Sequence, residues 1–212
     1  MNKRLFHAIT TITFGGPKRT YSDWYNADTL RQAMRMHRAE TNDASPYHLT
    51  GDCLGVIGDP RWDLVICHPP CTHLAVSGAH LFTEKIRDGR QQEGVAFFMR
   101  CVNEPRARFL CVENPVSIMS TIYRKPDQII QPYQFGHDAS KKTCLWLRGR
   151  LPLLMPTQHV PPRLVNGRPR WSNQTDSGQN NLSPSKNRAA IRARTYPGIA
   201  DAMAQQWGAL TP

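Results

Sequence analysis

The chain has 212 residues, with 27 Lys and Arg against 16 Asp and Glu, and a formal net charge of +11. This length suits one domain with a buried core, and a 40% share of hydrophobic residues is too high for a plainly disordered chain. Apolar runs extend over only a few residues, whereas a membrane-spanning helix needs about 20. The start of the chain is too polar for a signal peptide. We therefore expect a cytoplasmic protein with no membrane partner.

Residues 1–50 are expected to form the N-terminal part of the domain. The pattern predicts a helix over 23–40, where a Ser or Asp cap precedes apolar residues at helical spacing. Ahead of this helix, Gly15 and Gly16 follow a β-prone run. A glycine pair in such a place is most simply a turn, and the alternative is a loop that touches a cofactor.

Residues 51–150 contain the predicted α/β core. Apolar strands are predicted at 63–70 and 108–115, and a helix over 82–103 lies between them. Such a strand–helix–strand unit implies a right-handed crossover between parallel strands, so we expect a mostly parallel sheet. Two further strands, near an antiparallel edge, are predicted within 127–135 and 141–149.

Residues 151–195 are rich in Pro, Asn, Ser and Arg, and they are predicted to form a basic loop. Between 161 and 194, seven basic residues accompany a single acid. This excess indicates contact with a polyanion, nucleic acid first, and the simpler alternative is a solvated surface. Trp171, among these arginines, would stack on a base or anchor the loop to the core. Residues 196–212 complete the chain, and a helix is predicted over 197–208, between a proline and a glycine.

Reactive residues follow both predicted strands of the core. The first strand leads into a loop with Cys71 after two prolines, and the second leads into Glu113 and Asn114. In an open α/β sheet, ligands bind beyond the carboxyl ends of the strands. If the two strands are neighbours, Cys71 and Glu113 face one cleft. A thiol and a carboxyl group together indicate covalent attack by sulfur, with proton transfer or hydrogen bonding by the acid.

Four sequence blocks resemble those of the DNA cytosine-C5 methyltransferases. Two of them, HPPCTHLAVSGA and CVENP, are similar to the family's Pro-Cys and Glu-Asn loops. Together with PDQIIQPYQFGHDASKKTCLWL and RTYPGIADAMAQQWG, they resemble most closely a small phage and prophage branch. The resemblance covers about 51–212. It implies a Rossmann-like core that methylates cytosine in double-stranded DNA with S-adenosylmethionine, in a bacterial or phage-infected cell.

The resemblance also implies roles for the residues that match the family's motifs. Cys71 matches the nucleophile, whose thiolate adds to C6 of a cytosine flipped out of the duplex. Glu113 matches the acid that holds the cytosine ring at N3. On the cofactor side, the resemblance implies contacts from Asp52, Pro69 and Asn114.

Larger family members carry a separate recognition domain, for which this chain has no room. We therefore expect a monomer that contacts DNA phosphates through basic side chains near the site. The residues predicted for this role are Lys141, Lys142, Arg168, Arg170, Arg192 and Arg194. His137 and Asp138, in the same block as the two lysines, are expected to be structural.

Three features depart from the family pattern. Thr72 stands where Gln is usual and Pro115 where Val is usual, and both replacements occur in the phage branch. Residues 1–50 show no clean version of the family's glycine-containing cofactor loop. The hypothesis is that this segment is diverged, which leaves open a methyltransferase-like DNA-binding protein with impaired cofactor binding. A related enzyme that modifies C5 of a pyrimidine with another group is the other alternative.

The segment from Cys67 to His73 also invites a zinc hypothesis, because Cys and His side chains occur there at close spacing. The candidate ligands are Cys67, His68, Cys71, His73 and the nearby His80. Two prolines separate its cysteines, and the chain has no second Cys-x2-Cys pair, so no metal is expected. Several of the six cysteines fall inside apolar segments, which favours reduced thiols over disulfides.

Overall fold

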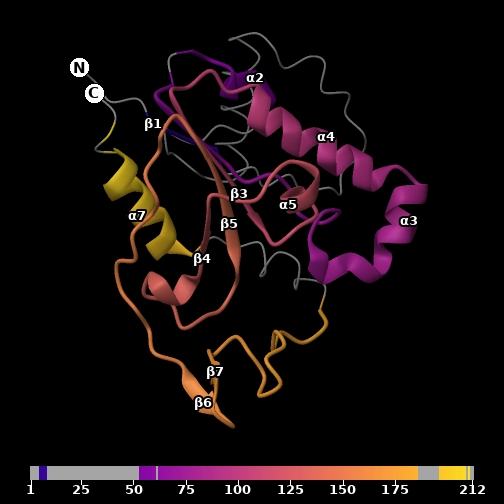
Figure 1. Ribbon diagram of the computed structural model, residues 1–212, viewed down its shortest axis with the longest axis vertical. Coiled ribbons are helices and arrows are strands. Elements are labelled where there is room, and N and C mark those ends of the chain that lie inside the picture. Colours follow the sequence, from indigo (N-terminus) through magenta and orange to yellow (C-terminus); the bar gives the residue numbers. More distant parts are fainter. Residues whose placement is uncertain (1–4, 9–52, 61, 186–195, 209, 211–212) are drawn as a thin grey trace, which may run out of the picture.

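The computed structural model describes residues 5–8, 53–60, 62–185, 196–208 and 210 (Figure 1). The helix expected over 23–40, the Gly15–Gly16 pair, Asp52, Arg192 and Arg194 lie outside these ranges. The described chain has an α/β fold with one mixed five-stranded sheet and a separate two-stranded hairpin.

Five strands in the order β1-β2-β3-β5-β4 make up the main sheet. Their bounds are Leu5–Ala8 (β1), Leu64–Cys67 (β2), Phe109–Pro115 (β3), Gln128–Ile130 (β4) and Thr143–Arg148 (β5). β2 pairs in parallel with β3, as the strand–helix–strand pattern predicts, and it also pairs in parallel with β1. β5 lies between β3 and β4 and is antiparallel to both, so it alone runs against the other strands of this sheet.

Three helical segments lie between β2 and β3 in the sequence, and the described helices as a whole are spread along the chain. They are α2 (Leu54–Ile57), a 3-10 helix (Val76–Leu81), α3 (Phe82–Arg87), α4 (Arg90–Asn103) and α5 (Met119–Ile122), followed after β4 by a 3-10 turn (Pro132–Gln134) and by α7 (Pro197–Gly208). The single helix expected over 82–103 is wrong, because Gly89 adopts a left-handed φ of 84° and separates α3 from α4. In the described part of the chain, no helix is both long and apolar enough to cross a membrane.

The sheet is covered by helices on both faces, and side-chain alternation along the strands explains why. In β2, Val65 and Cys67 face a core that also contains residues of α2 and α4, whereas Leu64 and Ile66 face a core built with α7. β3 alternates in the same way. Figure 1 shows α4 and α7 on opposite sides of the strands. Buried strands with two apolar faces are typical of this three-layer arrangement.

The C-terminal helix α7 has the bounds that the sequence predicts. Its first turn is fixed to the segment after β4, where Nε2 of His137 accepts a hydrogen bond from the Gly198 backbone N–H at 2.9 Å. A Cβ atom on Gly198 would lie only 2.0 Å from the carbonyl oxygen of Phe135, so only glycine fits there. His137 therefore has the structural role that we expect of it.

The basic segment contains more order than the loop predicted for 151–195. Two short strands, β6 (Arg163–Val165) and β7 (Arg168–Arg170), pair as an antiparallel hairpin. Asn166 and Gly167 form its turn with φ values of 50° and 72°. An Asn-Gly pair is the usual signal of such a two-residue turn, because both residues tolerate positive φ. The expectation of a loop is wrong here, and this dipeptide could have corrected it.

Candidate active site

The carboxyl ends of β2 and β3 lie side by side. The parallel register pairs Cys67 with Val112, so the next residues along the two strands are His68 and Glu113. Nδ1 of His68 lies 2.7 Å from Oε2 of Glu113. The two side chains are 16% and 19% exposed, so the pair is partly buried but still reachable. The strand alternation places it on the α7 face of the sheet.

Sequence reasoning missed His68 as a partner of Glu113 and weighed it only as a zinc ligand. The signal was available in the two apolar runs themselves. When LVICH is set beside FLCVE in the parallel register, His68 lies opposite Glu113. The pattern of one strand, however, specifies neither the strand that it pairs with nor the register of the pair.

A second link joins the same two loops on the opposite face. Nδ2 of Asn114 donates a hydrogen bond to the carbonyl oxygen of Pro69 at 2.7 Å, and Asn114 is only 1% exposed. Its Oδ1 atom is buried and has no hydrogen-bond partner among the described residues. Pro69 and Asn114, both predicted on the cofactor side, thus bind each other. Their contact with a cofactor stays a prediction.

The loop that follows β2 carries Cys71 into a tight turn. The carbonyl oxygen of Cys71 accepts hydrogen bonds from the backbone N–H groups of Leu74, at 3.0 Å, and Ala75, at 2.9 Å. The Nζ atom of Lys85, a residue only 4% exposed, donates to the carbonyl oxygen of Thr72 at 2.7 Å. The Cys71 side chain is half-buried, and hydrogen bonds to the carbonyl oxygens of Cys71 and Thr72 fix the backbone that carries it.

Backbone hydrogen bonds also connect the Cys71 loop to the loop after β3. The N–H of Val76 donates to the carbonyl of Val116 at 3.1 Å, and the N–H of Ile118 donates to the carbonyl of Leu74 at 3.1 Å. With the bonds of His68 and Asn114, four links join the two strand-end segments. The structure thus brings the Cys71 and Glu113 loops together, as expected if their strands are neighbours.

Glu113 lies in an electrostatic environment that favours its charged form. Burial raises the pKa of this carboxyl group, but the hydrogen bond with His68 and the positive charges of His68 and Lys141 outweigh it, so the pKa lies below its usual range. Lys141, predicted to bind phosphate, thus acts electrostatically on Glu113, and its Nζ lies 5.9 Å from the centre of the Tyr196 ring. Glu113 is a carboxylate at neutral pH.

The other cysteines differ from Cys71 in burial. Cys67, Cys101, Cys111 and Cys144 are buried free thiols in the two cores. Burial raises the pKa of Cys111 and Cys144, and the charge of Glu113 raises it further, so both stay protonated. Only Cys53 and Cys71 are partly exposed, and Cys71 lies in the loop that follows β2.

The hairpin is anchored to the core rather than detached from it. Trp171, which follows β7, is 8% exposed and stacks on Tyr133 with ring centres 4.0 Å apart and planes 7° from parallel. Its Nε1 donates to the carbonyl of Val160 at 3.1 Å. Of the two hypotheses for Trp171, the structure shows the anchor. Asp138 is structural as expected, because it accepts hydrogen bonds from Ser172.

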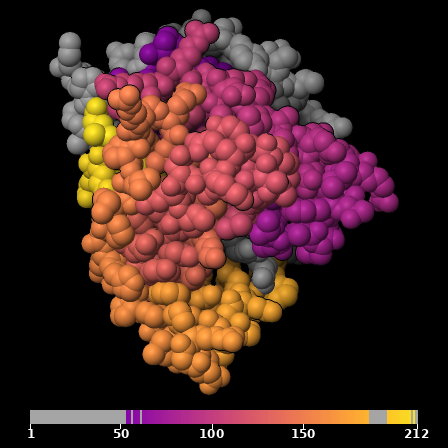
Figure 2. All heavy atoms as spheres, in the orientation of Figure 1, coloured from indigo at the N-terminus to yellow at the C-terminus, as the bar shows by residue number. Residues whose placement is uncertain are grey.

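The basic side chains of the hairpin differ in their surroundings. Arg168 is exposed, whereas Arg170 donates from Nε to the carbonyl of Asp176 at 3.0 Å. Arg163 forms an ion pair with Asp176 at 2.6 Å. Figure 2 shows this segment protruding from the end of the molecule, below the residues of β4 and its following turn. Lys142 is exposed next to Lys141, so the predicted phosphate contacts Lys142 and Arg168 are both accessible.

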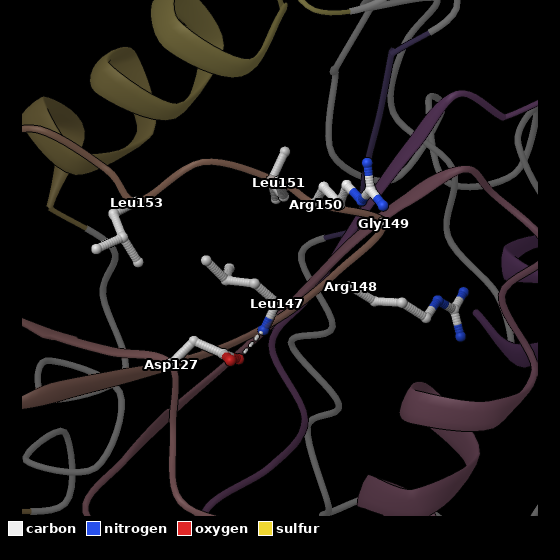
Figure 3. Close-up of a pocket in the computed structure, with 7 residues that line it drawn as sticks. All are labelled: Asp127, Leu147, Arg148, Gly149, Arg150, Leu151 and Leu153. Atoms are coloured by element: carbon white, nitrogen blue, oxygen red, sulfur yellow. Dashed lines mark hydrogen bonds between the residues drawn. The ribbon is translucent and has the colours of Figure 1, made fainter.

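A shallow pocket lies elsewhere, at the opposite end of β5 (Figure 3). Its lining includes Asp127, Leu147, Arg148 and Gly149, and Arg148 pairs with the amino end of β3 rather than with Glu113. Oδ2 of Asp127 accepts the backbone N–H of Leu147 at 2.6 Å, and Arg148 donates to two backbone carbonyls. The side chains of Asp127 and Arg148 are thus used in hydrogen bonds with the backbone, and we assign the pocket no function.

No protein-family model matches the chain. A search of curated proteins also finds no match. Among the described residues, no group of three or more His, Cys, Asp or Glu side chains is arranged to hold a metal ion. Cys67, part of the zinc hypothesis, has its Sγ turned toward the Cys101 carbonyl at 3.9 Å. The site therefore has to be interpreted from its own geometry.

Proposed function

We propose that the chain is a DNA (cytosine-5) methyltransferase that forms a covalent adduct through Cys71. The observation that carries the proposal is the joining of the Cys71 and Glu113 loops at the carboxyl ends of two parallel strands. That edge is where α/β sheets bind ligands. It combines a partly exposed thiol on a fixed turn with an ionised carboxylate, which are the two groups that covalent activation of a pyrimidine requires.

The chemistry assigns a different task to each side chain. The thiolate of Cys71 adds to C6 of the flipped cytosine, which makes C5 nucleophilic. Glu113 holds the ring at N3 and the exocyclic amine, where a carboxylate and a protonated ring nitrogen match as acceptor and donor. Flipping is required because C6 cannot be reached inside the stacked duplex.

S-adenosylmethionine, when bound, would supply an electrophilic methyl group. The described part of the site fits such a ligand in one respect, because the buried Oδ1 of Asn114 is an acceptor that lacks a partner among the described residues. An orphaned acceptor of this kind matches the N–H and O–H donors of the cofactor's adenosine and amino groups. Asn114 would hold the cofactor beside the Pro69 loop, to which its amide is bonded.

Double-stranded DNA is the proposed macromolecular partner. The net charge of +11 and the accessible Lys142 and Arg168 support contact with phosphates. Trp171 is committed to Tyr133, so the hairpin would bind the DNA backbone rather than stack on a base. Short or weak sequence selectivity follows, because phosphate contacts carry no direct sequence information.

The test uses duplex DNA of random sequence in which 5-fluorocytosine replaces cytosine, together with S-adenosylmethionine. The expected product is a protein–DNA adduct that survives denaturation, is lost in Cys71→Ser and is retained in the control Cys53→Ser. Calorimetry with S-adenosylmethionine should show binding in the micromolar range. Salt-sensitive DNA binding without an adduct would instead favour the impaired DNA-binding protein, and an adduct without methylation would favour the related C5-modifying enzyme.

A further inference from the structure

We propose that His68 is the proton source for Glu113 during attack on the base, so that the two side chains handle one proton as a pair. This inference rests on the proposed function and assigns a role to a residue for which the resemblance implies none. His68 would act through Glu113 and is therefore a positioning and proton-supplying residue rather than the group in contact with the ring.

The geometry of the pair suits proton transfer. Nδ1 of His68 and Oε2 of Glu113 are 2.7 Å apart, which is hydrogen-bond distance for a charged pair. Both residues continue adjacent parallel strands in register, so the backbone ladder and the Asn114–Pro69 hydrogen bond hold them together. The two side chains are 16% and 19% exposed, so the carboxyl group of Glu113 remains accessible to a ligand.

The charges around Glu113 explain why a proton source is required. The hydrogen bond with His68 and the charge of Lys141 overcome the effect of burial and hold its pKa below the usual range, so the free protein presents a carboxylate. A carboxylate cannot donate a proton to N3 of cytosine. Cys111 and Cys144, which also lie near Glu113, have a raised pKa because of burial and stay neutral.

Lys141 also carries a proton near the carboxylate, and its Nζ lies over the ring of Tyr196. A tyrosine hydroxyl ordinarily keeps its proton to about pH 10, and burial raises the pKa of Tyr196 further, so it is a poor donor at neutral pH. Imidazole is the side chain that ordinarily exchanges its proton between pH 5 and 8. Of the described groups that act on Glu113, His68 is the one with suitable chemistry.

The addition step balances in charge and in protons. The Cys71 thiolate forms a bond to C6, and the electron pair of the C5–C6 double bond moves into the ring toward N3. His68 starts as the imidazolium and transfers the proton on Nδ1 to Oε2 of Glu113, and the carboxyl group then passes that proton on to N3. His68 ends neutral, Glu113 ends as a carboxylate, and N3 carries the proton. The total charge is the same before and after the step.

The first experiment measures the rate of adduct formation with 5-fluorocytosine duplex DNA between pH 5.5 and 8.5 in wild type, His68→Asn and the control His80→Asn. The introduced asparagine amide can still donate a hydrogen bond to Glu113, but it cannot give up a proton. We expect the rate for wild type to decline toward high pH, and we expect His68→Asn to slow adduct formation by roughly 100-fold or more and to lack that decline. His80 is exposed on the 3-10 helix before α3, so its variant should behave as wild type.

A second experiment is independent of catalysis. Nitrogen-15 NMR of the free protein at the acid end of the same pH range should show His68 protonated on both ring nitrogens, because the Nδ1 proton faces the carboxylate. A His68 ring without a proton on Nδ1 there would overturn the inference, as would a His68→Asn variant with the rate and pH profile of wild type. If wild type forms no adduct at any pH, the proposed function itself fails and the proton transfer fails with it.

Discussion

The side-chain amide of Asn114 donates a hydrogen bond of 2.7 Å to the backbone carbonyl of Pro69, and Asn114 is almost fully buried. This bond links segments at the ends of two neighbouring strands on one face of the sheet, while His68 and Glu113 are linked on the other. The candidate site therefore lies at two strand ends that are connected by a hydrogen bond on each face of the sheet.

Removal of this link should cost stability. Asn114→Ala leaves the carbonyl of Pro69 without its donor, and such a loss costs about 1–3 kcal/mol. Urea denaturation of both proteins measures the free energy of unfolding. Asn103→Ala, at the exposed end of α4, is the matched control and should change this energy by less than about 0.5 kcal/mol. Equal values for the two variants would contradict the importance of the link.

The environment of Glu113 predicts how stability depends on pH. Burial raises the pKa of this carboxyl group, and the hydrogen bond and charge of His68 together with Lys141 lower it by more. A pKa that is lower in the folded than in the unfolded state stabilises the fold above the unfolded value, and this contribution is lost as pH falls through the folded value. We expect wild type to lose stability more steeply than Glu113→Gln below about pH 4.5.

Chemical denaturation at a series of pH values between roughly 3 and 7 tests this difference. Asp127 also has a lowered pKa, because its bonds with Arg124 and the Leu147 N–H outweigh its burial. That contribution is common to both proteins and cancels in the comparison. Parallel curves for wild type and Glu113→Gln would show that Glu113 has no favourable partner in the folded protein.

The stack between Trp171 and Tyr133 predicts a local effect on the basic hairpin. Trp171→Ala removes the ring contact and the hydrogen bond to Val160, so the hairpin should open more often. Hydrogen exchange of residues 163–170 should become faster, while exchange in β2 and β3 stays as in wild type. Trp171→Phe keeps a stacked ring, and aromatic pairs contribute about 0.5–1.5 kcal/mol beyond burial. Its hairpin should therefore exchange at rates between those of wild type and Trp171→Ala. Unchanged exchange in Trp171→Ala would exclude the anchoring role.

Arg168 offers a test of the DNA surface itself. If its exposed side chain contacts one phosphate, Arg168→Ala should weaken duplex binding and reduce the slope of log K against log salt concentration by about 1. Arg106→Ala removes the same charge from the exposed segment between α4 and β3 and serves as the control. Fluorescence anisotropy at several salt concentrations gives both slopes. The same loss of slope in both variants would indicate a general charge effect and no defined contact.

Elements with a strong local signal could be predicted from the sequence. The helix over 197–208 has a proline at its start and a glycine at its end, and the strands β2 and β3 are uninterrupted apolar runs before their reactive ends. The break at Gly89 was missed because a glycine inside a helical pattern is often tolerated, and only its left-handed backbone ends the helix. The partnership of His68 with Glu113 could not be read from either strand alone, because it depends on their pairing and register.

The position of α7 has a consequence for how the protein is made. Ile199, Met203 and Trp207 close the core that Leu64 and Ile66 begin much earlier in the sequence. A ribosome completes β2 and β3 before it reaches these residues, so until then this core lacks the cover that α7 supplies. An uncovered apolar face promotes aggregation. We therefore expect this core to be fully buried only after α7 has been synthesised.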